Sequence, residues 1–377
     1  MTKAASVAAE LSWPQVHAFR LQRHHLDGRA GRKDLARVVG EVGGAQAQVM
    51  SAAEMQIAVR ADCTVADVRD ALWNRRSLVK TWLMRGTLHL ARAEDLPVYT
   101  AAMGRHWIRI QPSWLKFMGV SETELWQLVD EIGAALDGTP LTREELIAVV
   151  GRGRSQHIRD ILRSGWGGML KPAARNGRLC FGPSRGQSVT FVNPRKWLKT
   201  WREVDPEAAI VEMARRYLRV YGPSTKNDFA RWWGAWPGVG TAAWKALGPE
   251  LVSVSVEGVR LEALAADLTA MGRAKLTEPV QLLPLFDPYL MGYAKRDHML
   301  DRVHAAKVSR TAGWISAVVL VGGVVVGTWT HTLAAGTLRI AIAPFSRLPA
   351  KVTAQARERA AEIAKALGAT GAEVAVA

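Results

Sequence analysis

Two glutamines separated by one alanine, Gln46 and Gln48, have side chains suited to placing a water molecule. In an extended segment, residues two apart share a face, so an extended stretch over residues 45–49 would aim both amides at one target. A neutral amide can orient water and point its carbonyl oxygen at a developing cation, but it is no strong general base. The alternative is that both side chains cap helix ends or face solvent.

The elements that must position these glutamines are two flanking helices. Residues 34–42 predict a helix, and Gly43-Gly44 suits a left-handed terminus. A second helix is predicted to start at Ser51, with Glu54 completing a capping box. The glutamines are therefore expected in a short connection between helices.

Composition indicates a polyanionic partner. The chain of 377 residues has 50 Lys and Arg against 34 Asp and Glu, a formal net charge of +16. Such an excess favours phosphates, whose neutralisation releases counterions. Two cysteines far apart, Cys63 and Cys180, fit a reducing cytoplasm and offer no zinc site. The N-terminus has no apolar core of signal-peptide length, and residues 314–329 predict a hairpin at Gly322-Gly323 rather than a spanning helix.

The order of predicted elements recurs along the chain. Short helices followed by paired strands describe a winged helix, and three such rounds precede a C-terminal part rich in strands. The predicted fold class is α+β: tandem winged-helix domains with a C-terminal mostly-β domain. The predicted domains are residues 1–118, which contain the glutamines, 119–204, 205–277 and 278–377.

Basic residues concentrate in the second predicted winged helix. A recognition-type helix carries Arg154, Arg159 and Arg163, and the following wing is predicted to carry Arg175, Arg178 and Arg185. A solvated helix face is the alternative for any single arginine, but a dense set in so basic a chain favours phosphate contact.

The sequence gives little indication of a metal site, a phosphate-binding loop or another catalytic group. The nine histidines are scattered without metal-ligand spacing, and no Gly-rich phosphate loop is present, so neither a metal nor a cofactor is expected. Asp287, in the segment LPLFDPYLMGY, can be a base or equally the residue of a turn that caps an element.

Four segments together resemble the AlkZ-type winged-helix DNA glycosylases. They are QAQ at 46–48, KTWLMRGTLHL at 80–90, LPLFDPYLMGY at 283–293 and the VVLVGGVVVGTW hairpin. The resemblance runs over nearly the whole chain. The RGTLHL and FDPYL segments are fairly specific to the wider family, and the QxQ pair marks its AlkZ branch. A sister branch carries aspartate in place of Gln48.

The resemblance implies a DNA glycosylase that excises bulky or crosslinked N7-alkylated purines, with Gln46 and Gln48 as catalytic residues. It also implies DNA repair that in some antibiotic producers gives self-resistance to a DNA-alkylating natural product. The expected partner is double-stranded DNA, bound by a cytoplasmic, nucleoid-associated monomer without a membrane or a cofactor. The residues predicted to contact DNA are Arg85, Thr87, His89, Arg154, Arg159, Arg163, Arg175, Arg178, Arg185 and Lys226.

A different class of protein remains open from the residues alone. Tandem winged helices can also form a transcriptional regulator without enzymatic activity, in which Gln46 and Gln48 merely cap helices. A regulator prefers a DNA sequence, whereas a glycosylase prefers a lesion and leaves an abasic site.

Overall fold

The computed structural model describes residues 7–377 except 105, 109, 166, 200 and 278. The chain divides into two compact units, Met1–Arg69 with Ala214–Ala377, and Asp70–Met213. Helices α4 (Val65–Trp73) and α12 (Pro206–Tyr221) carry the chain from one unit to the other. The four expected domains stay a prediction, and the boundary placed at residue 278 lies outside the described residues.

The unit Asp70–Met213 holds helices that precede a hairpin. Strands β3 (Leu78–Trp82) and β4 (Leu88–Arg92) pair antiparallel, and β5 (Leu141–Thr142) joins the β6–β7 hairpin through β7. The remaining elements are α5 (Leu96–Met103), α6 (Pro112–Met118), α7 (Glu122–Ala135), α8 (Arg143–Val150), α9 (Gln156–Arg163), α10 (Leu170–Arg175), β6 (Cys180–Arg185), β7 (Ser188–Val192) and α11 (Pro194–Trp197). From α7 to β7, helices are followed by a hairpin, and the assignment of a winged helix here stays a prediction.

One apolar core holds this unit together. Leu125, Leu128 and Ile132 of α7 recur at helical spacing and are fully buried, and they pack with Leu146 of α8 and Phe191 of β7. Burial of such side chains stabilises the folded chain by about 1.5–3 kcal/mol each. The amphipathic face of α7 therefore fixes the helices against the hairpin.

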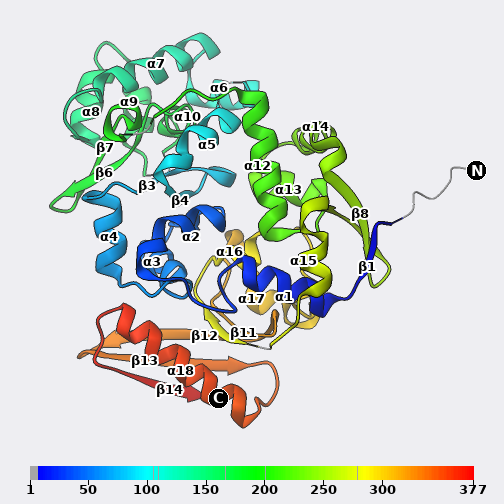
Figure 1. Ribbon diagram of the computed structural model, residues 1–377. Coiled ribbons are helices and arrows are strands. Elements are labelled where there is room, and N and C mark those ends of the chain that lie inside the picture. Colours follow the sequence, from blue (N-terminus) through cyan, green and yellow to red (C-terminus); the bar gives the residue numbers. More distant parts are fainter. Residues whose placement is uncertain (1–6, 105, 109, 166, 200, 278) are drawn as a thin grey trace, which may run out of the picture. The chain divides into compact units, whose positions relative to one another are not determined.

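The other unit repeats helices followed by a hairpin. Strand β1 (Ala9–Leu11) runs parallel to β8, which pairs antiparallel with β9. Its elements before the C-terminal sheet are α1 (Trp13–Arg23), α2 (Leu35–Glu41), β2 (Ala45–Gln46), α3 (Met50–Ala58), α13 (Lys226–Trp233), α14 (Pro237–Leu247), β8 (Leu251–Val256), β9 (Val259–Leu264) and α15 (Leu268–Arg273). Figure 1 shows α12, α13 and α14 next to the β8 hairpin.

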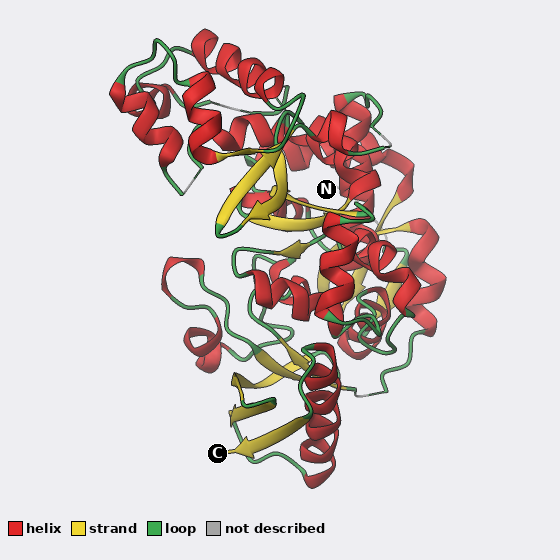
Figure 2. Cartoon of the chain, turned by 90° about the vertical axis from the view of Figure 1, so that its left-hand side faces the viewer, coloured by secondary structure: helices red, strands yellow, loops and turns green. Residues whose placement is uncertain are grey.

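The C-terminal part is a five-stranded sheet covered by one helix. Its strand order is β10-β11-β12-β13-β14, antiparallel except between β13 and β14. Helix α18 (Ala350–Ala366) lies along this sheet, as Figures 1 and 2 show. The strands are β10 (Val280–Leu283), β11 (Val318–Val321), β12 (Val324–Ala334), β13 (Thr337–Pro344) and β14 (Gly371–Val376), and the short helices α16 (Pro288–Met291) and α17 (Ala305–Val308) precede β11.

The predicted fold class, α+β with a C-terminal sheet, is confirmed, and so is the hairpin turn at Gly322-Gly323. Both glycines have positive φ, +54° and +87°, which is the conformation that a two-residue turn between β11 and β12 requires. None of the helices in the described part of the chain is long and apolar enough to span a membrane.

Two local expectations are wrong. Helix α3 begins at Met50 after Val49, and Ser51 caps nothing, because Glu54 is turned into the core and pairs with Arg69 instead. Arg175 is not part of the wing, since it is the last residue of helix α10, ahead of β6.

Candidate active site

The glutamine segment follows a helix end that only glycine can form. Gly43 and Gly44 have φ of +79° and +94°, and the Gly44 N–H donates to the Val39 carbonyl over 2.9 Å. A Cβ atom on Gly43 would stand 3.0 Å from the ring of Trp232. The left-handed conformation and this close packing both disfavour a side chain, and they define the direction in which the chain leaves α2.

The two glutamines differ in exposure. Gln46 belongs to the short strand β2 and is 6% exposed, whereas Gln48 lies in a bend and is exposed. The extended conformation expected over residues 45–49 is thus assigned as strand only at Ala45–Gln46. One glutamine lies within the protein and the other lies at its surface.

Hydrogen bonds hold the backbone around Gln46. The Tyr221 hydroxyl donates to the Val42 carbonyl over 3.1 Å, just ahead of the paired glycines. Nε2 of the buried Gln56 donates to the carbonyl oxygens of Gln46, over 3.3 Å, and Leu285, over 2.8 Å. The segment is therefore tied to α12 on one side and to α3 and the strand end after β10 on the other. Sequence reasoning missed Gln56, because nothing local marks it as a tether.

Asp287 takes part in a buried ion pair. Its two carboxylate oxygens accept from Arg60 over 2.6 and 2.8 Å, and one also accepts the Tyr289 N–H over 3.0 Å. Both Asp287 and Arg60 are at most 1% exposed. Asp287 therefore caps helix α16 and binds Arg60, and these contacts favour the structural interpretation of the FDPY segment over a catalytic base.

Arg60 connects this pair to the glutamine segment. Its Nη1 also donates to the Gln56 carbonyl over 2.8 Å, while the Gln56 side chain holds the Gln46 carbonyl. A continuous path of hydrogen bonds thus runs from Asp287 through Arg60 and Gln56 to Gln46. In a buried setting such bonds are strong and an unpaired member is costly, so the path restricts the backbone of Gln46.

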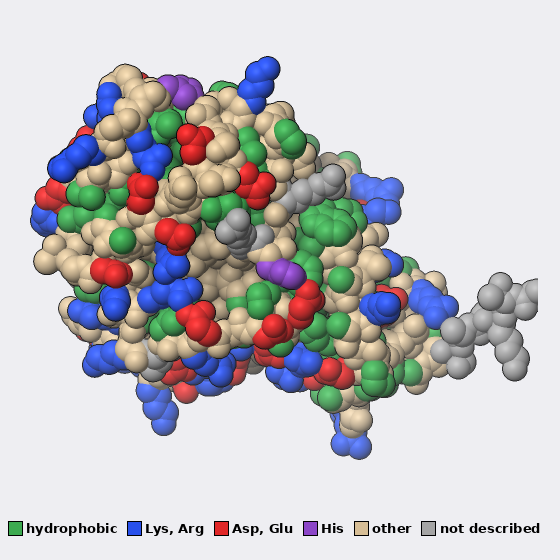
Figure 3. Space-filling view, turned by 90° about the horizontal axis from the view of Figure 1, so that it is seen from above, with side chains coloured by type: hydrophobic (Ala, Val, Ile, Leu, Met, Phe, Trp, Pro, Cys, Tyr) green, Lys and Arg blue, Asp and Glu red, His purple; other side chains and the backbone are tan. Residues whose placement is uncertain are grey.

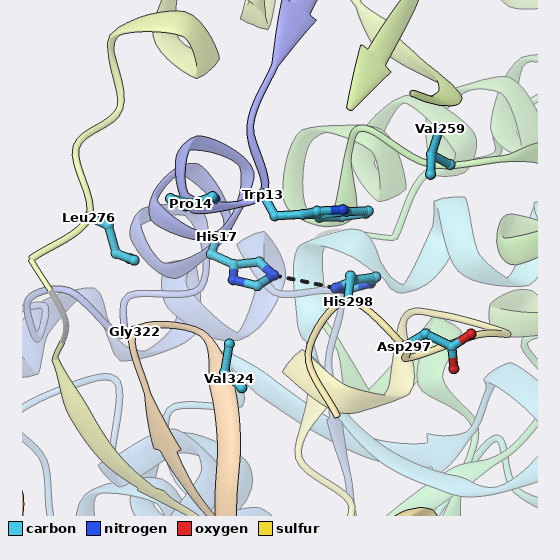
Figure 4. A pocket seen from close by; sticks show the side chains of 9 residues that line it. All are labelled: Trp13, Pro14, His17, Val259, Leu276, Asp297, His298, Gly322 and Val324. Carbon is cyan, nitrogen blue, oxygen red and sulfur yellow. Dashed lines mark hydrogen bonds between the residues drawn. The ribbon is translucent and has the colours of Figure 1, made fainter. Parts of the chain in front are cut away.

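A cavity of about 510 Å³ opens beside helix α1, away from the glutamine path (Figure 4). His298 stacks on Trp13 with ring centroids 4.4 Å apart, and its Nδ1 lies 3.4 Å from Nε2 of His17. Nη1 of Arg20 lies 3.4 Å from Nε2 of His298. Burial, followed by the charge of Arg20, lowers the pKa of His17 to about 4 and that of His298 to about 2, so both are neutral at pH 7.

Several arginines predicted to bind DNA are neutralised within the unit Asp70–Met213. On the face that Figure 3 draws, Lys and Arg side chains are interspersed with Asp and Glu rather than gathered by sign. The ion pairs are Arg154–Glu131 (2.7 Å), Arg163–Asp160 (3.1 Å), Arg178–Asp130 (3.0 Å) and Arg185–Glu145 (2.8 Å). Arg159 donates to the Gln156 side chain and the Arg154 carbonyl, and Lys226 is exposed at the start of α13.

The remaining predicted residues surround the turn between β3 and β4. Arg85 has a φ of +57° in this turn, and the Thr87 hydroxyl donates to the Met84 carbonyl over 3.1 Å. His89 is 2% exposed, and burial, with a further contribution from Arg85, lowers its pKa to about 3. His89 is thus a neutral side chain of the interior that supports the turn.

The chain belongs to a family of DNA-repair enzymes: residues 39–372 match the family described as DNA glycosylase AlkZ-like. It is 36% identical over 378 residues to the "Interstrand DNA cross-link repair glycosylase" of Streptomyces sahachiroi, which covers 95% of this chain and 97% of the relative. The solved structure of Streptomyces sahachiroi DNA glycosylase AlkZ matches 98% of this chain and 100% of its own, with a TM-score of 0.88 and 35% identity.

These likenesses confirm the family inferred from the sequence motifs and identify the chain as a DNA glycosylase. A DNA glycosylase acts on DNA, so DNA is the substrate class. The non-enzymatic regulator is not favoured.

Proposed function

We propose that this glycosylase releases bulky or crosslinked N7-alkylated purines from DNA by hydrolysis, with Gln46 and Gln48 as its catalytic residues. The observation that carries the proposal is the tethered segment, in which a buried Gln46 and an exposed Gln48 follow a helix end fixed by glycine packing. The name of the S. sahachiroi relative, which repairs interstrand crosslinks, supports a crosslinked adduct as the substrate. Self-resistance to a DNA-alkylating natural product is the biological role that we propose.

The chemistry suits neutral side chains. An N7-alkylated guanine is already cationic, so the bond between C1′ and N9 breaks with its electron pair moving to a base that leaves neutral. Water then adds to C1′ of the sugar cation and gives up its proton to solvent. In this reaction Gln48, which solvent reaches, orients the water, while the carbonyl oxygen of the Gln46 amide stabilises the sugar cation.

The glutamines also determine which lesions the enzyme can excise. Because a neutral amide cannot drive the departure of a poor leaving group, the enzyme selects cationic, labile lesions rather than lesions of a particular bulk. Tolerance of bulk follows if the lesion need not enter a tight pocket.

Single-turnover excision of N7-methylguanine from an oligonucleotide, followed by alkaline cleavage, tests this mechanism. Gln46→Ala and Gln48→Ala should each lower the excision rate about tenfold to a thousandfold, as expected when a group that positions water or stabilises a cation is lost. Gln48→Asp should retain part of the activity, because the added charge helps the cation, and Gln48→Glu should do worse because its carboxylate is displaced by one methylene.

Folding and DNA binding serve as the controls. Gln48 is exposed, so Gln48→Ala should change the free energy of unfolding by less than about 0.5 kcal/mol, and its affinity for undamaged duplex should not change. Gln46 is buried, so Gln46→Ala can lower the stability of the fold. Its excision rate is therefore measured at a temperature below the unfolding transition of the variant. Wild-type excision rates in both alanine variants would remove the glutamines from the mechanism.

A further inference from the structure

Two cations of helix α10 face the tight turn Met84–Gly86 in the unit Asp70–Met213. Lys171 and Arg175 are four residues apart, so they lie on the same side of the helix. A Cβ atom on Gly86 would stand 3.3 Å from Nη2 of Arg175 and 3.9 Å from Cδ of Lys171. Because Gly86 has no side chain and a φ of +67°, the turn approaches both cations closely.

Neither cation pairs with a carboxylate among the residues that the structure describes. Nε of Arg175 is buried and has no hydrogen-bond partner there. Burial lowers the pKa of Arg175, and burial together with the charge of Arg175 lowers that of Lys171, with no acidic group opposing either shift. Two partly buried like charges therefore stand side by side without compensation, which destabilises the free protein.

This pair differs from four other arginines of the same unit. Arg154, Arg163, Arg178 and Arg185 are each paired with a carboxylate within 3.1 Å. An arginine already held by a carboxylate has to give up that partner before it can bind a phosphate, whereas Lys171 and Arg175 do not. The uncompensated charge of Lys171 and Arg175 fits a ligand that supplies negative charge at this place.

We propose that Lys171 and Arg175, together with the Met84–Gly86 turn, form a binding site for one phosphate of the DNA backbone. The inference rests on the proposed function, since it takes duplex DNA as the partner. Arg175 supplies a planar guanidinium that can bind two phosphate oxygens, and Lys171 supplies a mobile ammonium. The bare Gly86 lets the sugar-phosphate backbone come within reach of both.

The experiment measures the dissociation constant for an undamaged duplex at several salt concentrations. Loss of one phosphate contact should reduce the slope of log K against log salt by about 1 and weaken binding of every sequence about equally. Lys171→Gln and Arg175→Gln should each show this reduction, with about fivefold to tenfold weaker binding at moderate salt. Arg175→Lys, which keeps the charge, should retain most of the slope.

The matched control is Arg195→Gln. Arg195 lies in the same unit, pairs with Glu203 and donates to the Gly177 carbonyl over 3.2 Å, so its removal should leave the slope unchanged. Arg178→Gln and Arg185→Gln should have smaller effects than Lys171→Gln. Lys171 is only partly buried, so its variant remains informative if Arg175→Gln fails to fold.

Excision of N7-methylguanine by the wild-type protein separates the two proposals. A wild-type protein that excises this base, with variants whose salt slope is unchanged, would overturn the phosphate site alone. A wild-type protein that leaves this base in place, with a reduced slope in Lys171→Gln, would overturn the proposed substrate chemistry and support the phosphate site. Equal slopes for Lys171→Gln and Arg195→Gln would also overturn the site.

Discussion

The buried pair of Asp287 and Arg60 links the stability of the fold to the position of Gln46. Both charges are withdrawn from water and bind each other and nearby backbone groups, while Nε of Arg60 has no hydrogen-bond partner among the described residues. Such a pair stabilises little compared with apolar residues of the same size, but removal of one partner leaves an uncompensated buried charge. Its specific contribution here is geometric, because Arg60 also holds the backbone of Gln56, which in turn holds Gln46.

We expect Asp287→Asn to lower the free energy of unfolding by about 3–5 kcal/mol, since Arg60 then stays charged and buried without its carboxylate. Urea denaturation measures this loss. The double variant Asp287→Leu, Arg60→Met should recover most of the stability, because no charge is left unpaired.

Excision by the double variant then tests the geometric role. Without Arg60, the Gln56 carbonyl loses its hydrogen-bond donor, and Gln56 then holds the backbone of Gln46 less firmly. Single-turnover excision should therefore fall at least about tenfold even in a stable protein. A double variant that is both stable and fully active would show that the pair serves stability alone.

At the scale of elements, the starts of several helices can be predicted from short capping motifs in the sequence. Thr64, Ser121 and Thr225 each cap the start of a helix, and an acidic residue stands three positions after each of them. The same spacing at Ser51 misled, because Glu54 is buried against Arg69 and the sequence carries no local sign of burial. Strand β14 also went unpredicted, since only its pairing with β13 makes it a strand.

The hairpin turn between β11 and β12 packs on helix α1 through histidines. A Cβ atom on Gly323 would stand 2.7 Å from that of His17, and the Gly322 backbone hydrogen-bonds the His17 ring. Because a guanidinium only donates, Arg20 leaves the proton of His298 on Nδ1, which donates to Nε2 of His17. This chain of contacts requires both imidazoles to be neutral.

Stability should therefore depend on pH through these histidines. The pKa of His17 is lowered to about 4 in the folded protein, so between pH 6.5 and 4 the unfolded chain binds more protons than the folded one. The free energy of unfolding should fall as the pH is lowered through this range, by up to about 1.4 kcal/mol per pH unit for each such histidine. His17→Gln should make the curve shallower in urea titrations from pH 7 to 4. An unchanged pH dependence would show that His17 is charged in the folded state or does not titrate in this window.

For the whole molecule, the sequence predicted the catalytic residues through a family resemblance and the DNA partner through net charge. It did not predict which cations are left without a carboxylate partner. Arg154 and Lys171 cannot be told apart in the sequence, since each is a basic residue in a basic region. Long-range pairing separates them: Glu131 neutralises the first, and none of the carboxylates in the described ranges pairs with the second. In the same way, Gln56 became visible as a tether only when α3 and Leu285 were brought together.

The salt dependence of DNA binding should reflect this distinction. The net charge of +16 predicts a high affinity for duplex DNA at low salt, but the number of phosphates bound is set by uncompensated cations rather than by the total. A lesion on the base adds no phosphate, so undamaged duplex and duplex with N7-methylguanine should give slopes of log K against log salt that agree to within about 1. Gln48→Ala, which we expect to slow excision, allows both to be measured before the base is released. A clearly steeper slope on the damaged duplex would show that lesion recognition recruits further cations, through rearrangement of the ion pairs seen here.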